Sequence, residues 1–197
     1  MENAVFLSIG RHGRCSYSGS LAITPASMIN AYLSAMDISK KGGPVEILLS
    51  SDVERAIATA YIRSKVWNCD TCEREDLGEA GPEKFKEFLL GMCLEAGRLG
   101  IKHMHVVTHD FHIEPFLGIK LDEDAYVIIK GKDWNEIHDS LESKTAKFEV
   151  SCVDVHKYEL KASFFAQIGI SEGMDNQAAM DKVVEYFQDN KNNPDSS

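Results

Sequence analysis

The chain has 197 residues, of which 44% are hydrophobic and 26% charged, the composition of an ordinary globular protein with one domain. Its 21 Lys and Arg face 31 Asp and Glu, so the formal net charge is −10. This charge argues against nucleic acid and membrane surfaces as partners, because both present phosphate groups that would repel the protein.

Hydrophobic patterning alternates between two types along the chain. Short apolar runs bounded by glycine or polar residues predict buried strands, and apolar residues at helical spacing predict helices. In chain order, we expect a strand at 5–9, a helix at 25–41, a strand at 45–49, a helix from 53 to beyond 61, a helix that starts at 82 and ends at Gly97 or Gly100, a strand at 103–108, a helix at 110–117, a strand at 125–129, a helix at 134–141 and a helix at 175–189.

Local signals mark several ends of these elements. Thr24-Pro25 predicts a helix start, with threonine as N-cap and proline in the first turn. Lys40-Lys41-Gly42-Gly43 predicts the end of that helix, because cations and then glycine suit a helix C-terminus. Three residues at 50–52 are possible caps of the next helix, Asp133 is expected to cap the helix at 134–141, and Gly118 ends the helix before it.

Three segments lack helical periodicity. The polar segment 67–81 is expected to be a loop. The segment 147–165 predicts a pair of strands with a turn near His156-Lys157. The tail 191–197 is polar and is expected to be disordered, which leaves a single domain over residues 1–190.

No apolar run approaches the ~18 residues that a membrane-spanning helix needs. The N-terminal segment 1–8 is acidic and turns polar too soon for a signal peptide. The chain has five cysteines, an odd number. These features predict free thiols in a reducing compartment, and hence a cytoplasmic protein.

The alternation of strands and helices predicts an α/β fold. We expect a three-layer α/β/α sandwich with a mostly parallel central sheet and helices on both faces. Ligands bind such sheets at the carboxyl ends of the strands. Those positions hold Arg11-His12-Gly13-Arg14, Ser50-Ser51-Asp52-Val53-Glu54-Arg55 and His109-Asp110.

Two histidines and several arginines that converge on one pocket suit phosphoryl transfer. A histidine Nε2 can attack phosphorus in line, and arginine can hold the phosphate oxygens with two parallel hydrogen bonds. The helix N-termini that follow these loops favour an anion. A carboxylic acid is then needed to protonate the leaving oxygen.

These segments resemble the histidine phosphatase superfamily, also called the phosphoglycerate-mutase-like superfamily. Arg11-His12-Gly13 follows a predicted strand, and Val106-Val107-Thr108-His109 carries the second histidine. Segment 50–60, Ser-Ser-Asp-Val-Glu-Arg-Ala-Ile-Ala-Thr-Ala, is similar to the family pattern Ser-Ser-x-x-x-Arg-Ala-x-x-Thr-Ala. The resemblance covers residues 4 to 118 with motifs, and continues to about residue 168 only in the order of elements.

The resemblance implies that His12 is the phosphorylated nucleophile and that Arg11, Arg55 and His109 complete the phosphate pocket. It implies neither a metal nor an organic cofactor. Arg14 stands where many members have Glu, which adds positive charge at the pocket and argues against a mutase-type first loop.

The identity of the acid stays open. Many members carry it as a Glu four residues before a Gly; counting back from Gly78 gives Arg74, with Glu73 and Glu75 on either side. Another branch uses the Asp directly after the second histidine, which is Asp110 here.

The sequence therefore predicts a phosphomonoesterase that works through a phosphohistidine intermediate on a phosphorylated metabolite or phosphoprotein. Two alternatives remain: a catalytically weak phosphate-binding module, and a phosphoglycerate-mutase-type phosphotransferase. A metal or redox site at Cys69-x-x-Cys72, or at His103, His105, His109 and His112, is disfavoured, because no second Cys-x-x-Cys and no fitting carboxylate pair accompanies them. The oligomeric state is not predicted.

Overall fold

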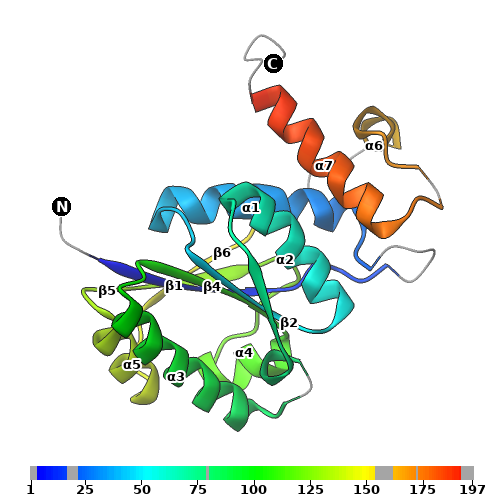
Figure 1. The fold of residues 1–197 in the computed structure, drawn as a ribbon. Helices are drawn as coiled ribbons and strands as arrows, with labels where there is room; N and C mark the ends of the chain where they lie inside the picture. Colours follow the sequence, from blue (N-terminus) through cyan, green and yellow to red (C-terminus); the bar gives the residue numbers. More distant parts are fainter. Residues whose placement is uncertain (1–3, 17–21, 79, 154–161, 172, 192–197) are drawn as a thin grey trace.

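The computed structural model describes residues 4–16, 22–78, 80–153, 162–171 and 173–191. At its centre is a six-stranded mixed sheet (Figure 1). The strand order is β3 (Thr71–Arg74), β2 (Ile47–Ser51), β4 (His103–Thr108), β1 (Val5–Arg11), β5 (Tyr126–Gly131) and β6 (Phe148–Ser151). β1 pairs in parallel with β4, and β2 pairs in parallel with β4 and β3. β5 runs antiparallel to both β1 and β6.

Helices cover both faces of this sheet (Figure 1), which confirms the predicted three-layer α/β/α architecture. Three clusters of buried apolar residues form the core, one on each face of the sheet and a third among the helices on one side of it. One face is covered by α1 (Pro25–Gly42) and α2 (Glu54–Trp67), on whose outer side α7 (Asn176–Lys191) and α6 (Ala162–Ile168) pack, and the other face is covered by α3 (Pro82–Leu99), α4 (Asp110–Leu117) and α5 (Trp134–Glu142).

The predicted helix signals hold in the structure. The Thr24 side chain accepts a hydrogen bond from the Ser27 N–H at 3.2 Å, and Pro25 opens α1. The Asp133 side chain accepts from the Glu136 N–H at 2.8 Å at the start of α5. These caps satisfy N–H groups that have no partner within the helix, so they fix where each helix begins.

Two expectations for the segment around α2 are wrong. The segment 67–81 is not entirely loop, because it contains β3 and a short 3₁₀ helix, η1 (Glu75–Leu77). β3 is an edge strand whose side chains are mostly exposed, so its backbone pairs with β2 without an apolar pattern in the sequence. The N-cap of α2 is Val53 rather than a residue of 50–52, although the Ser51 hydroxyl accepts from the Val53 N–H at 3.1 Å.

The predicted strand pair at 147–165 is half correct. β6 pairs with β5, whereas residues 162–168 form α6. Phe165 and Ile168 lie three residues apart and pack into the apolar cluster of α1, α2 and α7, a spacing that suits a helix. The expected turn at His156-Lys157 and the tail 192–197 lie outside the described residues, whereas Lys191 ends α7. One domain over 1–190 stays a prediction.

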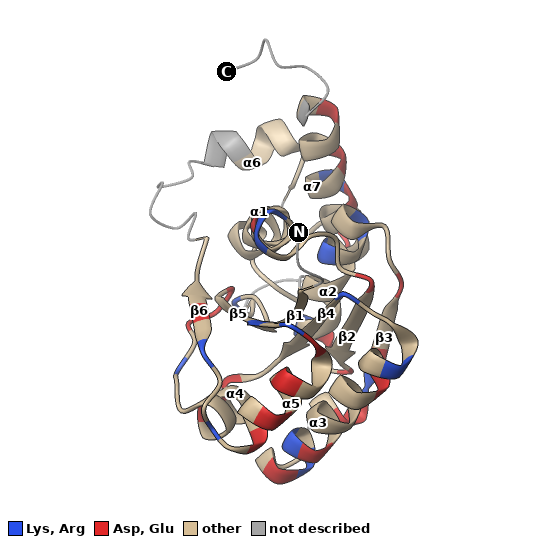
Figure 2. Cartoon of the chain, turned by 90° about the vertical axis from the view of Figure 1, so that its left-hand side faces the viewer, with Lys and Arg blue, Asp and Glu red and all other residues tan. Residues whose placement is uncertain are grey.

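Acidic residues lie on helices of both layers, for example on α7 and α3 (Figure 2). Among the described helices, none combines the length and the apolar character that a membrane crossing requires.

Candidate active site

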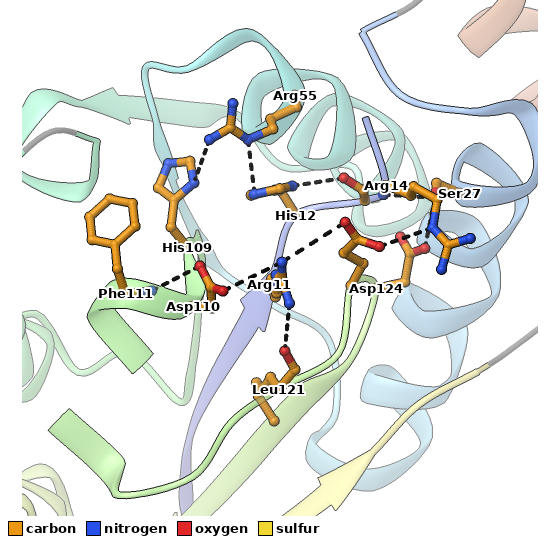
Figure 3. Close-up of polar contacts among 12 residues, drawn as sticks. Arg11, His12, Arg14, Ser27, Arg55, His109, Asp110, Phe111, Leu121 and Asp124 are labelled. Atoms are coloured by element: carbon orange, nitrogen blue, oxygen red, sulfur yellow. Dashed lines mark hydrogen bonds and ion pairs between the residues drawn. The ribbon is translucent and has the colours of Figure 1, made fainter. Parts of the chain in front are cut away.

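The carboxyl ends of three parallel strands meet at one edge of the sheet. β2, β4 and β1 are neighbours in that order, and they end at Ser51, Thr108 and Arg11. His12 directly follows β1, and His109 follows β4 as the N-cap of α4. The adjacent strands therefore bring together side chains that are about a hundred residues apart in the sequence (Figure 3).

One guanidinium connects the two histidines. Arg55, in the first turn of α2, donates from Nε to His12 Nε2 at 2.9 Å and from Nη2 to His109 Nδ1 at 3.3 Å. The two imidazole rings stand edge to face with centroids 4.9 Å apart. His12 is 5% exposed and His109 is 1% exposed, so both rings are removed from bulk water.

These contacts fix the tautomers of both rings. His12 Nδ1 lies 2.7 Å from the Gly13 carbonyl oxygen, which only accepts, so Nδ1 carries the proton and Nε2 keeps its lone pair. Arg55 only donates, so His109 Nδ1 accepts and its Nε2–H donates to the Ser51 hydroxyl at 2.9 Å. His12 Nε2 is therefore the unprotonated ring nitrogen that can act as the nucleophile, and it accepts from Arg55 in this structure.

The surroundings keep both rings neutral. Burial lowers the pKa of His12 from 6.5 to about 4, with further lowering by the positive charges of Arg55 and Arg11. Burial also lowers the pKa of His109 to about 3, assisted by His12 and Arg55. At neutral pH His12 therefore holds the unprotonated nitrogen that an attack on phosphorus needs.

Gly13 is required by close packing beside the nucleophile. A Cβ at this position would lie 2.8 Å from Ser27 Cβ and 2.9 Å from Asp124 Oδ1. The Gly13 N–H donates to the Thr59 hydroxyl at 2.9 Å, and that hydroxyl donates to the Arg55 carbonyl oxygen at 2.9 Å. The nucleophile segment is thereby joined directly to the helix that carries Arg55.

Arg11 lies beside this centre, but its side chain is held by the loop before β5. Its Nη1 donates to the Leu121 carbonyl oxygen at 2.9 Å. Its Nη2 lies 3.5 Å from Asp110 Oδ2 and 3.9 Å from Glu123 Oε1. Arg14, on the more exposed side, pairs with Glu123 at 3.0 Å. Arg11 and Arg14 thus both pair with the Glu123 carboxylate, a contact that the sequence does not predict.

Asp110 and Glu75, two of the three candidate acids, occupy different positions. Asp110 opens α4 directly after His109, is 37% exposed and contacts Arg11 (Figure 3). Glu75 is exposed in η1, and in the described part of the chain no hydrogen bond or ion pair joins its side chain to His12, His109 or Arg55. Of the two, only Asp110 is brought into contact with the site.

Sequence reasoning missed three residues around the site. Phe111 stacks on His109 with centroids 5.1 Å apart, and Glu123 and Asp124 approach the nucleophile segment from the loop before β5. The only sequence signal for Glu123 and Asp124 is a run of three acidic residues, 122–124, shortly before a buried strand, which by itself is typical of many solvated loops.

The histidines of β4 are engaged with protein groups. The Ser8 hydroxyl lies 3.0 Å from His103 Nε2 and 2.6 Å from His105 Nδ1. Arg63, fully buried in α2, contacts His105 Nε2 at 2.8 Å and donates to the Ser34 hydroxyl at 3.1 Å. This is a hydrogen-bonded network of the core between the sheet and α2.

Comparison with known proteins bears on the fold. No protein-family model matches the sequence, and no curated protein matches it. The structure of the protein histidine phosphatase SixA with tungstate matches with a TM-score of 0.55 and 16% identity, over 75% of this chain and 97% of that chain. The chain has the fold of the histidine phosphatase superfamily.

A second histidine phosphatase agrees with this assignment. A mycobacterial glucosyl-3-phosphoglycerate phosphatase matches with a TM-score of 0.53 and 13% identity, over 77% of this chain and 99% of that chain. The predicted α/β architecture and the predicted resemblance are thus confirmed.

Proposed function

We propose that this chain is a phosphomonoesterase that works through a phosphohistidine intermediate on His12. The observation that carries the proposal is the buried, neutral His12 ring, whose Nε2 faces the Arg55 guanidinium beside His109. The histidine phosphatase fold supports it, since the two solved structures described above are phosphatases.

In the first half-reaction, the His12 Nε2 lone pair forms a bond to phosphorus while the bond from phosphorus to the ester oxygen breaks. When the phosphate group binds, the N–H groups of Arg55 donate to its oxygens instead of to His12 and stabilise their negative charge. Arg11 and Arg14 add positive charge nearby. The leaving oxygen takes a proton from Asp110, which the contact with Arg11 holds next to the pocket.

In the second half-reaction, a water oxygen forms a bond to phosphorus and its proton passes to the Asp110 carboxylate. The electron pair of the N–P bond returns to Nε2, and inorganic phosphate is released. We assign the proton transfers to Asp110 rather than Glu75, because Asp110 follows His109 in the chain and contacts Arg11.

The substrate class is a phosphorylated metabolite or a phosphoprotein. The two structural relatives, a protein histidine phosphatase and a sugar-phosphate phosphatase, represent both possibilities. We propose that the activity is cytoplasmic, because an odd number of cysteines, five, suits a reducing compartment.

The test is hydrolysis of p-nitrophenyl phosphate by the wild type and by His12→Ala, with labelled substrate and rapid quenching. We expect an acid-labile, base-stable phosphate on the peptide that contains His12, and no turnover by the variant. Label on Cys15, or full activity of the variant, would refute the mechanism. Phosphate binding without turnover would identify a binding module. With a second substrate, a phosphate ester that carries another hydroxyl, transfer of the phosphoryl group to that hydroxyl would identify a mutase.

A further inference from the structure

The loop before β5 holds the nucleophile segment 11–14 along its length. The Leu121 carbonyl oxygen accepts from the Arg11 side chain, and the Ala125 carbonyl oxygen accepts from the Arg11 N–H at 2.9 Å. The Asp124 N–H donates to the His12 carbonyl oxygen at 3.3 Å. The segment therefore takes its conformation from this loop as well as from β1.

Asp124 is unusual within this loop. It is 1% exposed, although it is a carboxylate, and its φ of 67° lies in the left-handed region that few residues other than glycine adopt. Its Oδ2 accepts from the Ser27 hydroxyl at 2.8 Å and from Asn30 Nδ2 at 3.2 Å. The backbone conformation and the burial of the carboxyl group are both unfavourable by themselves, and the hydrogen bonds to Oδ2 offset part of that cost.

The contacts of Asp124 fix the two peptide groups on either side of Gly13. The peptide between His12 and Gly13 is held at its oxygen by the Asp124 N–H. The peptide between Gly13 and Arg14 is held at its N–H by the Ser27 hydroxyl at 2.9 Å, and that hydroxyl donates to Asp124. Because a peptide group is planar, holding the Arg14 N–H also orients the Gly13 carbonyl oxygen.

The Gly13 carbonyl oxygen is the acceptor that keeps the proton of His12 on Nδ1. We propose that Asp124 is a positioning residue for the nucleophile: through Ser27 and through its own N–H, it orients the Gly13 carbonyl, which aims the His12 ring and leaves Nε2 unprotonated. Its importance for catalysis rests on the proposed function, whereas its control of the ring does not.

Two substitutions test the side chain of Asp124 separately from its backbone conformation. Asp124→Gly accepts the positive φ but removes the carboxylate, and Asp124→Asn tolerates the same φ and keeps a side-chain oxygen for Ser27. We expect the rate of His12 phosphorylation in a single turnover to fall about tenfold or more in Asp124→Gly, because the nucleophile loses its orientation. We expect Asp124→Asn to stay within about threefold of the wild type, because it keeps the acceptor for Ser27.

The decisive readout is the tautomer of His12, measured by nitrogen NMR of the ring without any substrate. The wild type and Asp124→Asn should show the proton on Nδ1, and Asp124→Gly should add a population with the proton on Nε2. Ile137→Val removes a buried methyl group from α5, on the other side of the sheet, and so controls for general destabilisation. This variant should leave the His12 tautomer and the rate of His12 phosphorylation unchanged.

An unchanged His12 tautomer in Asp124→Gly would overturn the proposal, and so would an Asn variant that is as impaired as the Gly variant. If Asp124→Gly does not fold, Ser27→Ala breaks the same connection from its other end and should give the same NMR signature. If the wild type itself does not hydrolyse phosphate esters, the proposed function fails, while the tautomer measurement still decides the positioning role.

Discussion

Acidification should destabilise the protein through His12 in particular. The unfolded chain binds a proton at His12 with the ordinary pKa of 6.5, whereas the folded protein binds it only near a pKa of about 4. A lowered pKa in the folded state means that the contribution of His12 to stability is fully present above pH 6.5. It is lost progressively as the pH falls from there to about 4, because only the unfolded state gains a proton in that range.

The magnitude follows from the shift. The complete difference between 6.5 and about 4 corresponds to ~3 kcal/mol at ~1.4 kcal/mol for each pKa unit. Between pH 7 and pH 5 the unfolded state gains most of its proton and the folded state gains almost none, which accounts for about 2 kcal/mol.

Urea denaturation at these two pH values, in a buffer without phosphate, measures the effect in the wild type and in His12→Gln. The other buried histidines, whose pKa values burial also lowers, are present in both proteins and largely cancel. We expect the free energy of unfolding of the wild type to fall by about 2 kcal/mol more than that of the variant. Equal pH dependence within ~0.5 kcal/mol would show that His12 is not a buried neutral ring, and would refute the reasoning.

Four further outcomes are expected. Arg55→Lys keeps the charge but loses one of two separate N–H contacts, so kcat/KM should fall ~30- to 1,000-fold in steady-state assays. Asp110→Asn should slow alkyl phosphates by ~100-fold or more and p-nitrophenyl phosphate much less, whereas Glu75→Gln should show no such leaving-group dependence. Gly13→Ala would place a methyl group 2.8 Å from Ser27 Cβ and should lower the unfolding free energy by about 1–3 kcal/mol in thermal melts. Chelation with EDTA and reduction with dithiothreitol should leave the activity unchanged, and a loss in either would point to Cys69 and Cys72.

Burial pattern explains which parts of the fold were predictable. β1 and β4 are buried on both faces, so their apolar runs identify them directly. β3 is exposed and joins the sheet through its backbone alone, which leaves no periodic signal in its four residues. The antiparallel direction of β5 depends on how the chain returns to β1, a tertiary property that periodicity does not encode.

The residues of the site also differ in how far the sequence predicts them. The positions of His12 and His109 directly after strands, and of Arg55 in the first turn of a helix, follow from the order of elements, so the sequence is sufficient to bring them together. Asp124 could not be predicted, because its role depends on a left-handed backbone and on a hydroxyl about a hundred residues away. Glu75 was placed near the site by its distance from Gly78 in the sequence, but η1 leaves its side chain exposed.

The buried contacts of Arg63 have a practical consequence for protein engineering. Arg63 and Arg55 lie on the same helix, eight residues or ~12 Å apart. His105 and Ser34 hold the Arg63 side chain in the core, which prevents α2 from sliding or turning about its axis. The direction in which Arg55 leaves the helix is thereby fixed as well. Libraries that seek a new substrate range should therefore spare the buried half of α2 and vary the exposed side chains of Arg14, which follows β1, and Phe111, in the first turn of α4.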